Sequence, residues 1–149
     1  MSDAPGLQVR TPSGTYPVEI QVGIAARLAG VIDALGAPRR RFVVSNPTVW
    51  RLHGDTFSGL SAEDPILIPD GERHKQLATV GRIYDALIRS AADRATTIVA
   101  IGGGVVGDIA GFAAATYLRG VPVVQVPTTL LAQVDSAIGG KVGVNLAAG

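Results

Sequence analysis

An apolar run that ends in a glycine-rich turn constrains the fold of this chain more than any other feature. Residues 97–101 read Thr-Ile-Val-Ala-Ile, and they are followed by Gly102-Gly103-Gly104-Val105-Val106-Gly107 and by small apolar residues up to Leu118. A short β-branched run without polar alternation predicts a strand that is buried on both faces. Glycines between such a strand and a helix are typical of a strand-to-helix turn in a parallel sheet.

The rest of the chain repeats this alternation of strand and helix. Further strands are predicted at 41–45, 66–68 and 123–126, and helices at 24–35, 49–53, 77–88 and from 128 to about 138. Two short β-type runs at 7–9 and 16–20, separated by Thr-Pro-Ser-Gly, predict an N-terminal β-hairpin. We therefore expect one α/β, Rossmann-like domain over residues 1–149, with a mostly parallel sheet and helices on both of its faces.

Composition narrows the class of function. The chain has 149 residues with 13 basic and 12 acidic side chains, a net charge of +1. This balance does not favour binding to nucleic acid or to a membrane surface, because both require clustered basic charge. Cysteine is absent, which excludes disulfides and fits a reducing compartment. We see no signal peptide and no apolar stretch of the ~20 residues that a transmembrane helix needs, so we expect a cytoplasmic protein.

The glycine turn has the G-x-G-x-x-G spacing of phosphate-binding loops. Glycine lets the backbone approach a pyrophosphate closely, and the free N–H groups at the start of the next helix favour an anion. A tight turn packed against a neighbouring element would produce the same pattern. Ordinary Rossmann dehydrogenases place this loop after their first strand and a ribose-binding acid about 20 residues later. Here the loop begins only at Gly102, and the next strand ends in Pro127-Thr128-Thr129, so the acid must come from elsewhere.

Glu72 is the candidate for that acid. It lies in the polar turn that follows the predicted strand at 66–68, and Lys75 is placed to contact either Glu72 or a ribose oxygen. Other candidates are an acid after the glycines, two threonines and an acid–lysine pair, namely Asp108, Thr128, Thr129, Asp135 and Lys141. Each also has a structural explanation, because acids favour helix starts, threonines cap helices and oppositely charged neighbours form salt bridges.

Three blocks of the sequence resemble the 3-dehydroquinate synthases of the sugar-phosphate cyclase superfamily. They are residues 102–120, residues 126–145 and the turn Asp70-Gly71-Glu72 with Lys75. Together they account for most of residues 66–149, whereas the first 65 residues match only in general layout. Iron-type alcohol dehydrogenases share the scaffold, but they carry a serine and a lysine where this chain has Val105 and Gly111.

The resemblance implies an enzyme that uses NAD and a divalent metal, zinc or cobalt. It would convert 3-deoxy-D-arabino-heptulosonate 7-phosphate to 3-dehydroquinate with release of phosphate, a step of the shikimate pathway. The implied NAD-binding residues are Asn46, Asp70, Glu72, Lys75, Gly103, Gly104, Val105, Gly107, Asp108, Thr128 and Thr129. Glu72 and Lys75 would hold the adenosine ribose, and Asp108 would face the nicotinamide. The sugar-acid phosphate would contact Asp135 and Lys141, with Arg119 binding its phosphate group across a homodimer interface.

The same resemblance places the metal ligands outside this chain. In the family a helical C-terminal half supplies one Glu and two His ligands, whereas this chain has only His53 and His74, without a ligand-like spacing. We therefore expect residues 1–149 to be the NAD-binding half alone, without the helical metal domain, and to be inactive without that half as partner. Two alternatives stay open, namely another sugar-phosphate cyclase and a non-catalytic NAD-binding module.

Overall fold

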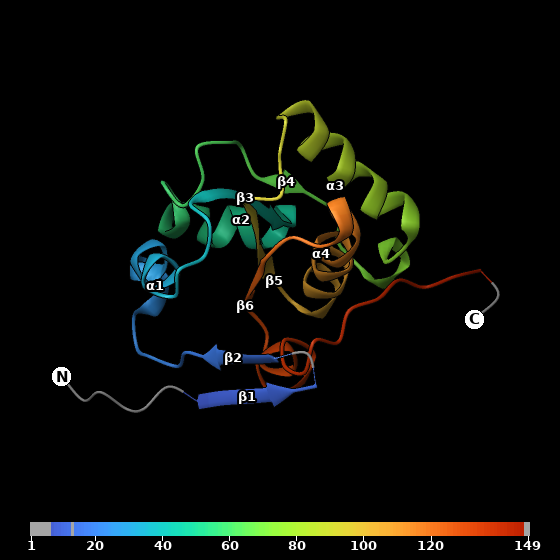
Figure 1. The fold of residues 1–149 in the computed structure, drawn as a ribbon. Helices are drawn as coiled ribbons and strands as arrows, with labels where there is room; N and C mark the ends of the chain where they lie inside the picture. Colours follow the sequence, from blue (N-terminus) through green and yellow to red (C-terminus); the bar gives the residue numbers. More distant parts are fainter. Residues whose placement is uncertain (1–6, 13, 148–149) are drawn as a thin grey trace.

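A four-stranded parallel sheet lies at the centre of the computed structural model, which describes residues 7–12 and 14–147 (Figure 1). The strand order is β4-β3-β5-β6, and the strands are β3 (Arg40–Ser45), β4 (Ile66–Leu67), β5 (Thr96–Gly102) and β6 (Val123–Pro127). Every pair is parallel, so the carboxyl ends of the strands meet along one edge of the sheet. In open α/β sheets ligands bind at this edge.

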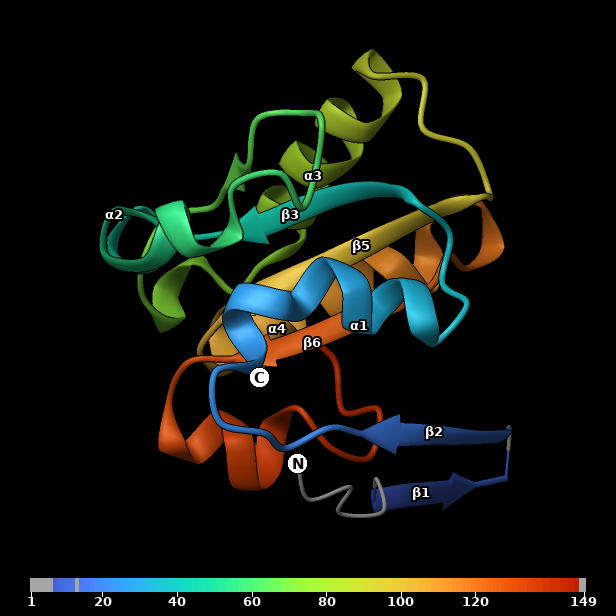
Figure 2. The same cartoon turned by 90° about the vertical axis from the view of Figure 1, so that its left-hand side faces the viewer.

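Helices cover both faces of the sheet, as the sequence predicts (Figures 1 and 2). One face packs against α1 (Leu28–Ala34) and α2 (Pro47–His53), and the other packs against α3 (Leu77–Arg89) and α4 (Gly104–Thr116). Side chains along β3 and β5 alternate between the two apolar cores, one on each face of the sheet. The β5 strand is buried at every residue, which explains why it reads as an uninterrupted apolar run.

The N-terminal hairpin packs below the sheet, against the segment that follows β6 (Figure 2). Its strands are β1 (Leu7–Thr11) and β2 (Gly14–Val18), paired antiparallel as the sequence predicts. The Tyr16 hydroxyl accepts a hydrogen bond of 2.6 Å from the backbone N–H of Gly139. The hairpin therefore supports the chain just beyond the last predicted helix.

Two predicted helices end differently in the structure. The helix expected up to Leu118 stops at Thr116 and continues as a 3₁₀ turn, η4 (Tyr117–Arg119), in which Leu118 and Arg119 have φ of 49° and 70°. The Tyr117 hydroxyl donates to the carbonyl of Ala92 at 2.9 Å, which anchors the turn through its buried Tyr117 side chain.

The last helix, predicted from 128 to about 138, is a short π-helical turn, η5 (Ala132–Ser136). It ends early because Gly139 and Gly140 adopt φ of 88° and 68°, outside the helical region. Over the part of the chain that the structure describes, no helix is both long enough and apolar enough to span a bilayer.

Alanine substitutions at two isoleucines test where the core lies. Ile109 of α4 is 0% exposed, whereas Ile88 of α3 is 64% exposed. We expect Ile109→Ala to lower the free energy of unfolding by about 2–5 kcal/mol, because it removes buried apolar surface and leaves a cavity. Ile88→Ala should lower it by less than about 1 kcal/mol. Urea unfolding followed by circular dichroism measures both, and equal losses would contradict this packing.

Candidate functional site

The predicted ligand residues form a row along the carboxyl edge of the sheet. Asp70 follows β4, Asn46 follows β3, Gly103 follows β5 and Thr128 follows β6. Neighbouring strands are about 4.8 Å apart, so the row spans roughly 15 Å, enough for an extended ligand. The sheet thus brings together residues that are 82 positions apart in sequence.

The glycine loop lies between the end of β5 and the first turn of α4. Gly103 is the N-cap of α4, with an extended backbone, and neither Gly103 nor Gly104 has a positive φ. An added Cβ on Gly103 would lie 3.2 Å from Thr129 Cγ2, and one on Gly104 would lie 3.2 Å from Ser136 Oγ. Other chain segments therefore approach Gly103 and Gly104 too closely for a side chain, whereas their backbone angles would allow one. This close packing and an anion-binding role are compatible.

Gly107 serves helix packing in this structure. A Cβ at this position would lie 2.8 Å from Gln125 Oε1, and the Gln125 Nε2 group donates to the Gly107 carbonyl at 3.1 Å. The third glycine of the motif therefore lets α4 lie against β6. This is the helix–sheet contact that a third glycine allows in dinucleotide-binding turns.

An ionic cluster connects the turn after β4 with the first turns of α4. Lys75 Nζ lies 2.5 Å from Asp108 Oδ2 and 3.9 Å from Glu72 Oε1. The side chains of Lys75 and Asp108 are only 19% and 15% exposed, whereas that of Glu72 is 65% exposed. The contact of Lys75 with Glu72 is one of the two contacts that the sequence leaves open for this lysine. The resemblance assigns Lys75 and Asp108 to opposite ends of NAD, yet here they meet at one point of the site.

Asn145 also joins this cluster, although no motif in the sequence singles it out. Its backbone N–H donates to the carbonyl of Lys75 at 2.7 Å, and its Nδ2 donates to Glu72 Oε1 at 2.9 Å. In the sequence, Asn145 is only the last residue of the block 126–145 that resembles the family. A contact between residues 73 positions apart depends on how the chain returns after η5, which local patterns do not encode.

Three of the remaining NAD candidates have structural partners of their own. Asn46 Oδ1 accepts from the Val49 N–H at 2.8 Å and caps α2, and Asp70 accepts from the Thr48 hydroxyl at 3.0 Å. Thr129 Oγ1 accepts from the Ala132 N–H at 3.2 Å, which ties Thr129 to the first residue of η5. These bonds hold the loops of the edge in place. Whether the same residues also contact NAD stays a prediction.

Asp135 and Lys141 form the ion pair that the sequence predicted as one possibility. Their side chains are 54% and 61% exposed. They belong to the segment that brings Ser136 over the glycine loop. The pair is therefore solvent-accessible, as a substrate contact would require, although binding to a substrate stays a prediction.

Arg119 lies far from all of these residues in its own chain. It follows the C-terminal end of α4, whereas the glycine loop lies at the other end of this 13-residue helix. At 1.5 Å per residue the helix is about 20 Å long. Arg119 is exposed and has a positive φ, which is uncommon for a residue with a side chain. It cannot reach the ligand row of its own chain.

The described residues do not fit a divalent metal site. No group of three or more His, Cys, Asp or Glu side chains able to hold an ion occurs within 7–12 and 14–147. His53 ends α2, whereas His74 lies in the turn η3 (Glu72–His74) and its Nε2 accepts from Arg73 Nε at 2.9 Å. We therefore assign no chemistry to a metal held by these residues.

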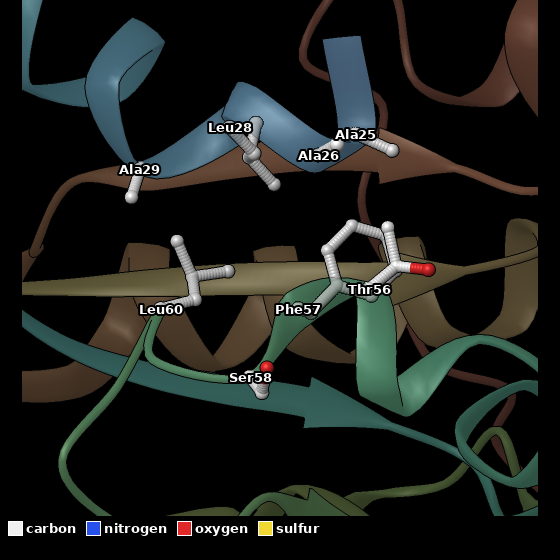
Figure 3. Close-up of a pocket in the computed structure, with 8 residues that line it drawn as sticks. All are labelled: Ala25, Ala26, Leu28, Ala29, Thr56, Phe57, Ser58 and Leu60. Atoms are coloured by element: carbon white, nitrogen blue, oxygen red, sulfur yellow. The ribbon is translucent and has the colours of Figure 1, made fainter. Parts of the chain in front are cut away.

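A small pocket lies between α1 and the turn η2 (Gly54–Phe57), as Figure 3 shows. Leu28, Phe57 and Leu60 supply its larger apolar side chains, and no charged residue lines it. None of the predicted ligand residues contributes to this pocket. It therefore offers nothing for a phosphate or a dinucleotide.

Comparison with known proteins identifies the family. The family described as "3-dehydroquinate synthase N-terminal" matches residues 65–149, more than half of the chain. This chain belongs to that family. The 3-dehydroquinate synthase of Pelotomaculum thermopropionicum is 49% identical over 136 residues, 88% of this chain and 37% of that protein. The 3-dehydroquinate synthase of Gloeobacter violaceus is 49% identical over 144 residues, 93% of this chain and 40% of that protein.

Solved structures of sugar-phosphate cyclases have the same fold. A 2-deoxy-scyllo-inosose synthase complexed with carbaglucose-6-phosphate, NAD+ and Co2+ has a TM-score of 0.83 at 28% identity, over 97% of this chain and 41% of that chain. The 2-epi-5-epi-valiolone synthase of Streptomyces hygroscopicus subsp. jinggangensis 5008, with NAD+ and Zn2+ bound, has a TM-score of 0.70 at 36% identity, over 80% of this chain and 35% of that chain. The predicted family and fold are confirmed, and this member spans about 40% of the length of the curated relatives.

Double-mutant cycles on Lys75–Asp108 and Lys141–Asp135, two ion pairs of the candidate site, test its electrostatics. We expect a coupling free energy of about 1–3 kcal/mol between Lys75→Met and Asp108→Asn, because this pair is largely shielded from water. The exposed pair, probed by Lys141→Met and Asp135→Asn, should couple by about 0–1 kcal/mol. Urea unfolding of the single and double variants gives both values. A stronger coupling in the exposed pair would contradict the described burial.

Proposed function

We propose that the carboxyl edge of the sheet binds NAD, and that residues 1–149 are the NAD-binding domain of a 3-dehydroquinate synthase. The observation that carries the proposal is the row of Glu72, Asn46, the glycine loop and Thr128 at the ends of four parallel strands. A helix start with free N–H groups favours an anion, and an exposed acid such as Glu72 suits the hydroxyls of a ribose. The relatives named above are 3-dehydroquinate synthases, and two structural neighbours were solved with NAD.

The strand order supports a direction for the dinucleotide. The N–H groups of Gly103, Gly104 and Val105 at the start of α4 suit the negatively charged pyrophosphate. The turn containing Glu72 lies two strands away, about 10 Å, beyond Asn46. We infer that the adenosine ribose lies over Glu72, Lys75 and Asp70, with Asn46 between this turn and the glycine loop. The nicotinamide would then extend in the other direction, towards the loop after β6 that carries Thr128 and Thr129.

In the proposed reaction, bound NAD supplies a reversible hydride acceptor for a hydroxyl of 3-deoxy-D-arabino-heptulosonate 7-phosphate. The residues of this chain would bind and orient the reactants. Asp135 and Lys141 are accessible, and they belong to the segment whose Ser136 approaches the glycine loop. Lys141 would attract the anionic substrate, and Asp135 would accept hydrogen bonds from its hydroxyls.

A homodimer is proposed from the position of Arg119. Arg119 is too far from the ligand row of its own chain to contact a ligand there. It would therefore bind the substrate phosphate at the site of a second copy. Its guanidinium fork suits a phosphate group. The unusual backbone of Leu118 and Arg119 is the kind of local strain that occurs where a side chain must be presented in a fixed direction.

A metal-binding C-terminal half is proposed as the second partner. The described residues offer no ligand set for a metal, whereas the structural neighbours were solved with Co2+ or Zn2+. Leu130, Leu131 and Val134, beside Asp135, are 75%, 68% and 67% exposed. An apolar face of this kind next to the ligand row suits a covering domain, which would also exclude water from the site.

A second candidate function is the cyclisation of a different sugar phosphate. The observation in its favour is the TM-score of 0.83 with the 2-deoxy-scyllo-inosose synthase, over nearly the whole chain. Sequence identity is 28% in that comparison but 49% with the 3-dehydroquinate synthases, so we favour the latter activity. A non-catalytic NAD-binding module would leave the exposed Asp135–Lys141 pair and Arg119 without a purpose.

Substitution of the glycine loop tests NAD binding. Gly104→Val should abolish binding, because the side chain would project towards Ser136 and into the space that we assign to the pyrophosphate. Gly81→Val in α3 is the matched control, since nothing lies within 4 Å of an added Cβ there. Isothermal titration with NAD measures both variants, and circular dichroism checks their folding. If Gly104→Val binds NAD as tightly as the unaltered chain, the loop does not hold the pyrophosphate.

Catalysis is expected to need more than these 149 residues. We expect no phosphate release from the purified chain supplied with zinc, NAD and 3-deoxy-D-arabino-heptulosonate 7-phosphate, because the described residues form no group able to hold a metal ion. A chimera that joins this chain to the remaining part of the Pelotomaculum thermopropionicum relative should be active. Comparable turnover by the chain alone would contradict the proposal. Preference of the chimera for a hexose 6-phosphate would favour the second candidate function.

Subunit complementation in the same chimera tests the role of Arg119. Chimeras carrying Arg119→Ala or Asp135→Ala should each be nearly inactive. When the two are co-expressed, a mixed dimer contains one site with both groups intact if the arginine acts across the interface, so activity should reappear. Phosphate release by the isolated mixed dimer is the measurement. No recovery in a verified mixed dimer would place Arg119 outside the reaction, because it cannot reach the site of its own chain.

A further inference from the structure

Asn145 makes two hydrogen bonds to the turn that we assign to the adenosine ribose. The backbone N–H donates to the Lys75 carbonyl at 2.7 Å, and the side-chain Nδ2 donates to Glu72 Oε1 at 2.9 Å. Residues 139–147 thus return from η5 to the opposite end of the ligand row. No other described hydrogen bond between side chains connects this segment with the turn after β4.

The side-chain bond restrains an otherwise mobile carboxylate. The Glu72 side chain is 65% exposed, and a long exposed side chain samples several rotamers in water. Both of its described contacts involve the same oxygen, since Lys75 Nζ also lies nearest to Oε1, at 3.9 Å. Oε2 is left free to accept a hydrogen bond. Lys75 is itself held by Asp108 at 2.5 Å, so the whole cluster is anchored to α4.

We propose that Asn145 is a positioning residue, which holds Glu72 Oε1 so that Oε2 faces the 2′-hydroxyl of the adenosine ribose. The proposal rests on the proposed function, since it requires a ribose at Glu72. A carboxylate accepts hydrogen bonds and donates none, and a ribose hydroxyl is a suitable donor. A restrained carboxylate loses less conformational entropy on binding than a free one, so Asn145 contributes to affinity without contacting the ligand.

The structure makes this role separable from a role in folding. In Asn145→Ala the backbone N–H remains, so the bond to the Lys75 carbonyl is kept and only the restraint on Glu72 is lost. Asn145→Asp places a second carboxylate beside Glu72 and should push it away. Gln8→Ala is a matched control for the loss of an exposed amide, and Glu63→Ala is the control for the loss of an exposed carboxylate.

The test uses isothermal titration of the 149-residue chain with NAD and with NAD that lacks the 2′-hydroxyl of its adenosine ribose. The unaltered chain should prefer NAD. Asn145→Ala should weaken NAD binding about three- to ten-fold, the range of one hydrogen bond, and should narrow the preference for NAD over the deoxy analogue. Asn145→Asp should weaken it further, and the two control variants should leave it unchanged. A purely structural effect would weaken the binding of both ligands equally and leave the ratio of their affinities unchanged.

The double variant decides whether Asn145 acts through Glu72. In a Glu72→Ala background, Asn145→Ala should have no further effect on NAD affinity. If the two substitutions cause additive losses of NAD affinity, or if the ratio of the affinities for NAD and the deoxy analogue does not change, the proposal is overturned while NAD binding itself stands. Tighter NAD binding by Asn145→Ala would also overturn it, because the amide would then compete with the ribose. Absence of NAD binding by the unaltered chain would instead refute the proposed function.

Discussion

The close approach of α4 to its neighbours is the contact on which the rest of the structure depends. Side chains at Gly104, Gly107 or Gly111 would meet Ser136, Gln125 and Val142 at distances of 3.2 Å or less. Because these positions carry only hydrogen, α4 lies against β6 and beneath the segment that follows it. The same approach brings the first turn of α4 to the edge of the sheet, where its free N–H groups face the ligand row. Close packing therefore requires a residue without a side chain at these positions, and at Gly104 the proposed binding of a pyrophosphate would require the same.

The charged residues proposed as ligand contacts lie on surfaces of the chain that are far apart. Lys75, Asp108 and Glu72 gather at one end of the row, and Asp135 and Lys141 are exposed near the other. The remaining candidate, Arg119, lies a helix length away at the opposite edge of the sheet. A second copy and a metal-carrying domain follow from this distribution as proposals, and each corresponds to an identifiable surface of the chain.

Much of the fold could be predicted because its signals are local. The uninterrupted apolar run of β5 and the glycines after it specify a buried strand and a strand-to-helix turn, and the structure has both. The ends of helices were less predictable. Thr116 ends α4 because the buried Tyr117 bonds to Ala92, and η5 ends early because two glycines adopt positive φ. Neither effect is visible in hydrophobic periodicity.

The site shows the same division between local and long-range information. Residues at strand ends, such as Asn46 and Gly103, could be placed at one edge from the sequence, because parallel strands end together. The contact of Lys75 with Asp108 and that of Asn145 with Glu72 could not. They depend on how α3 packs beside α4 and on the path of the chain after η5. Both are tertiary relations between segments far apart in sequence.

The central claim is that NAD lies along the carboxyl edge of the sheet, and amide chemical shifts of the ¹⁵N-labelled chain test it most directly. On titration with NAD, the account predicts that the largest shifts occur at Gly103, Gly104, Glu72 and Thr128. The residues around the pocket of Figure 3, such as Phe57 and Leu60, should change little. Shifts concentrated at that pocket or on the hairpin, with the glycine loop unaffected, would contradict the account.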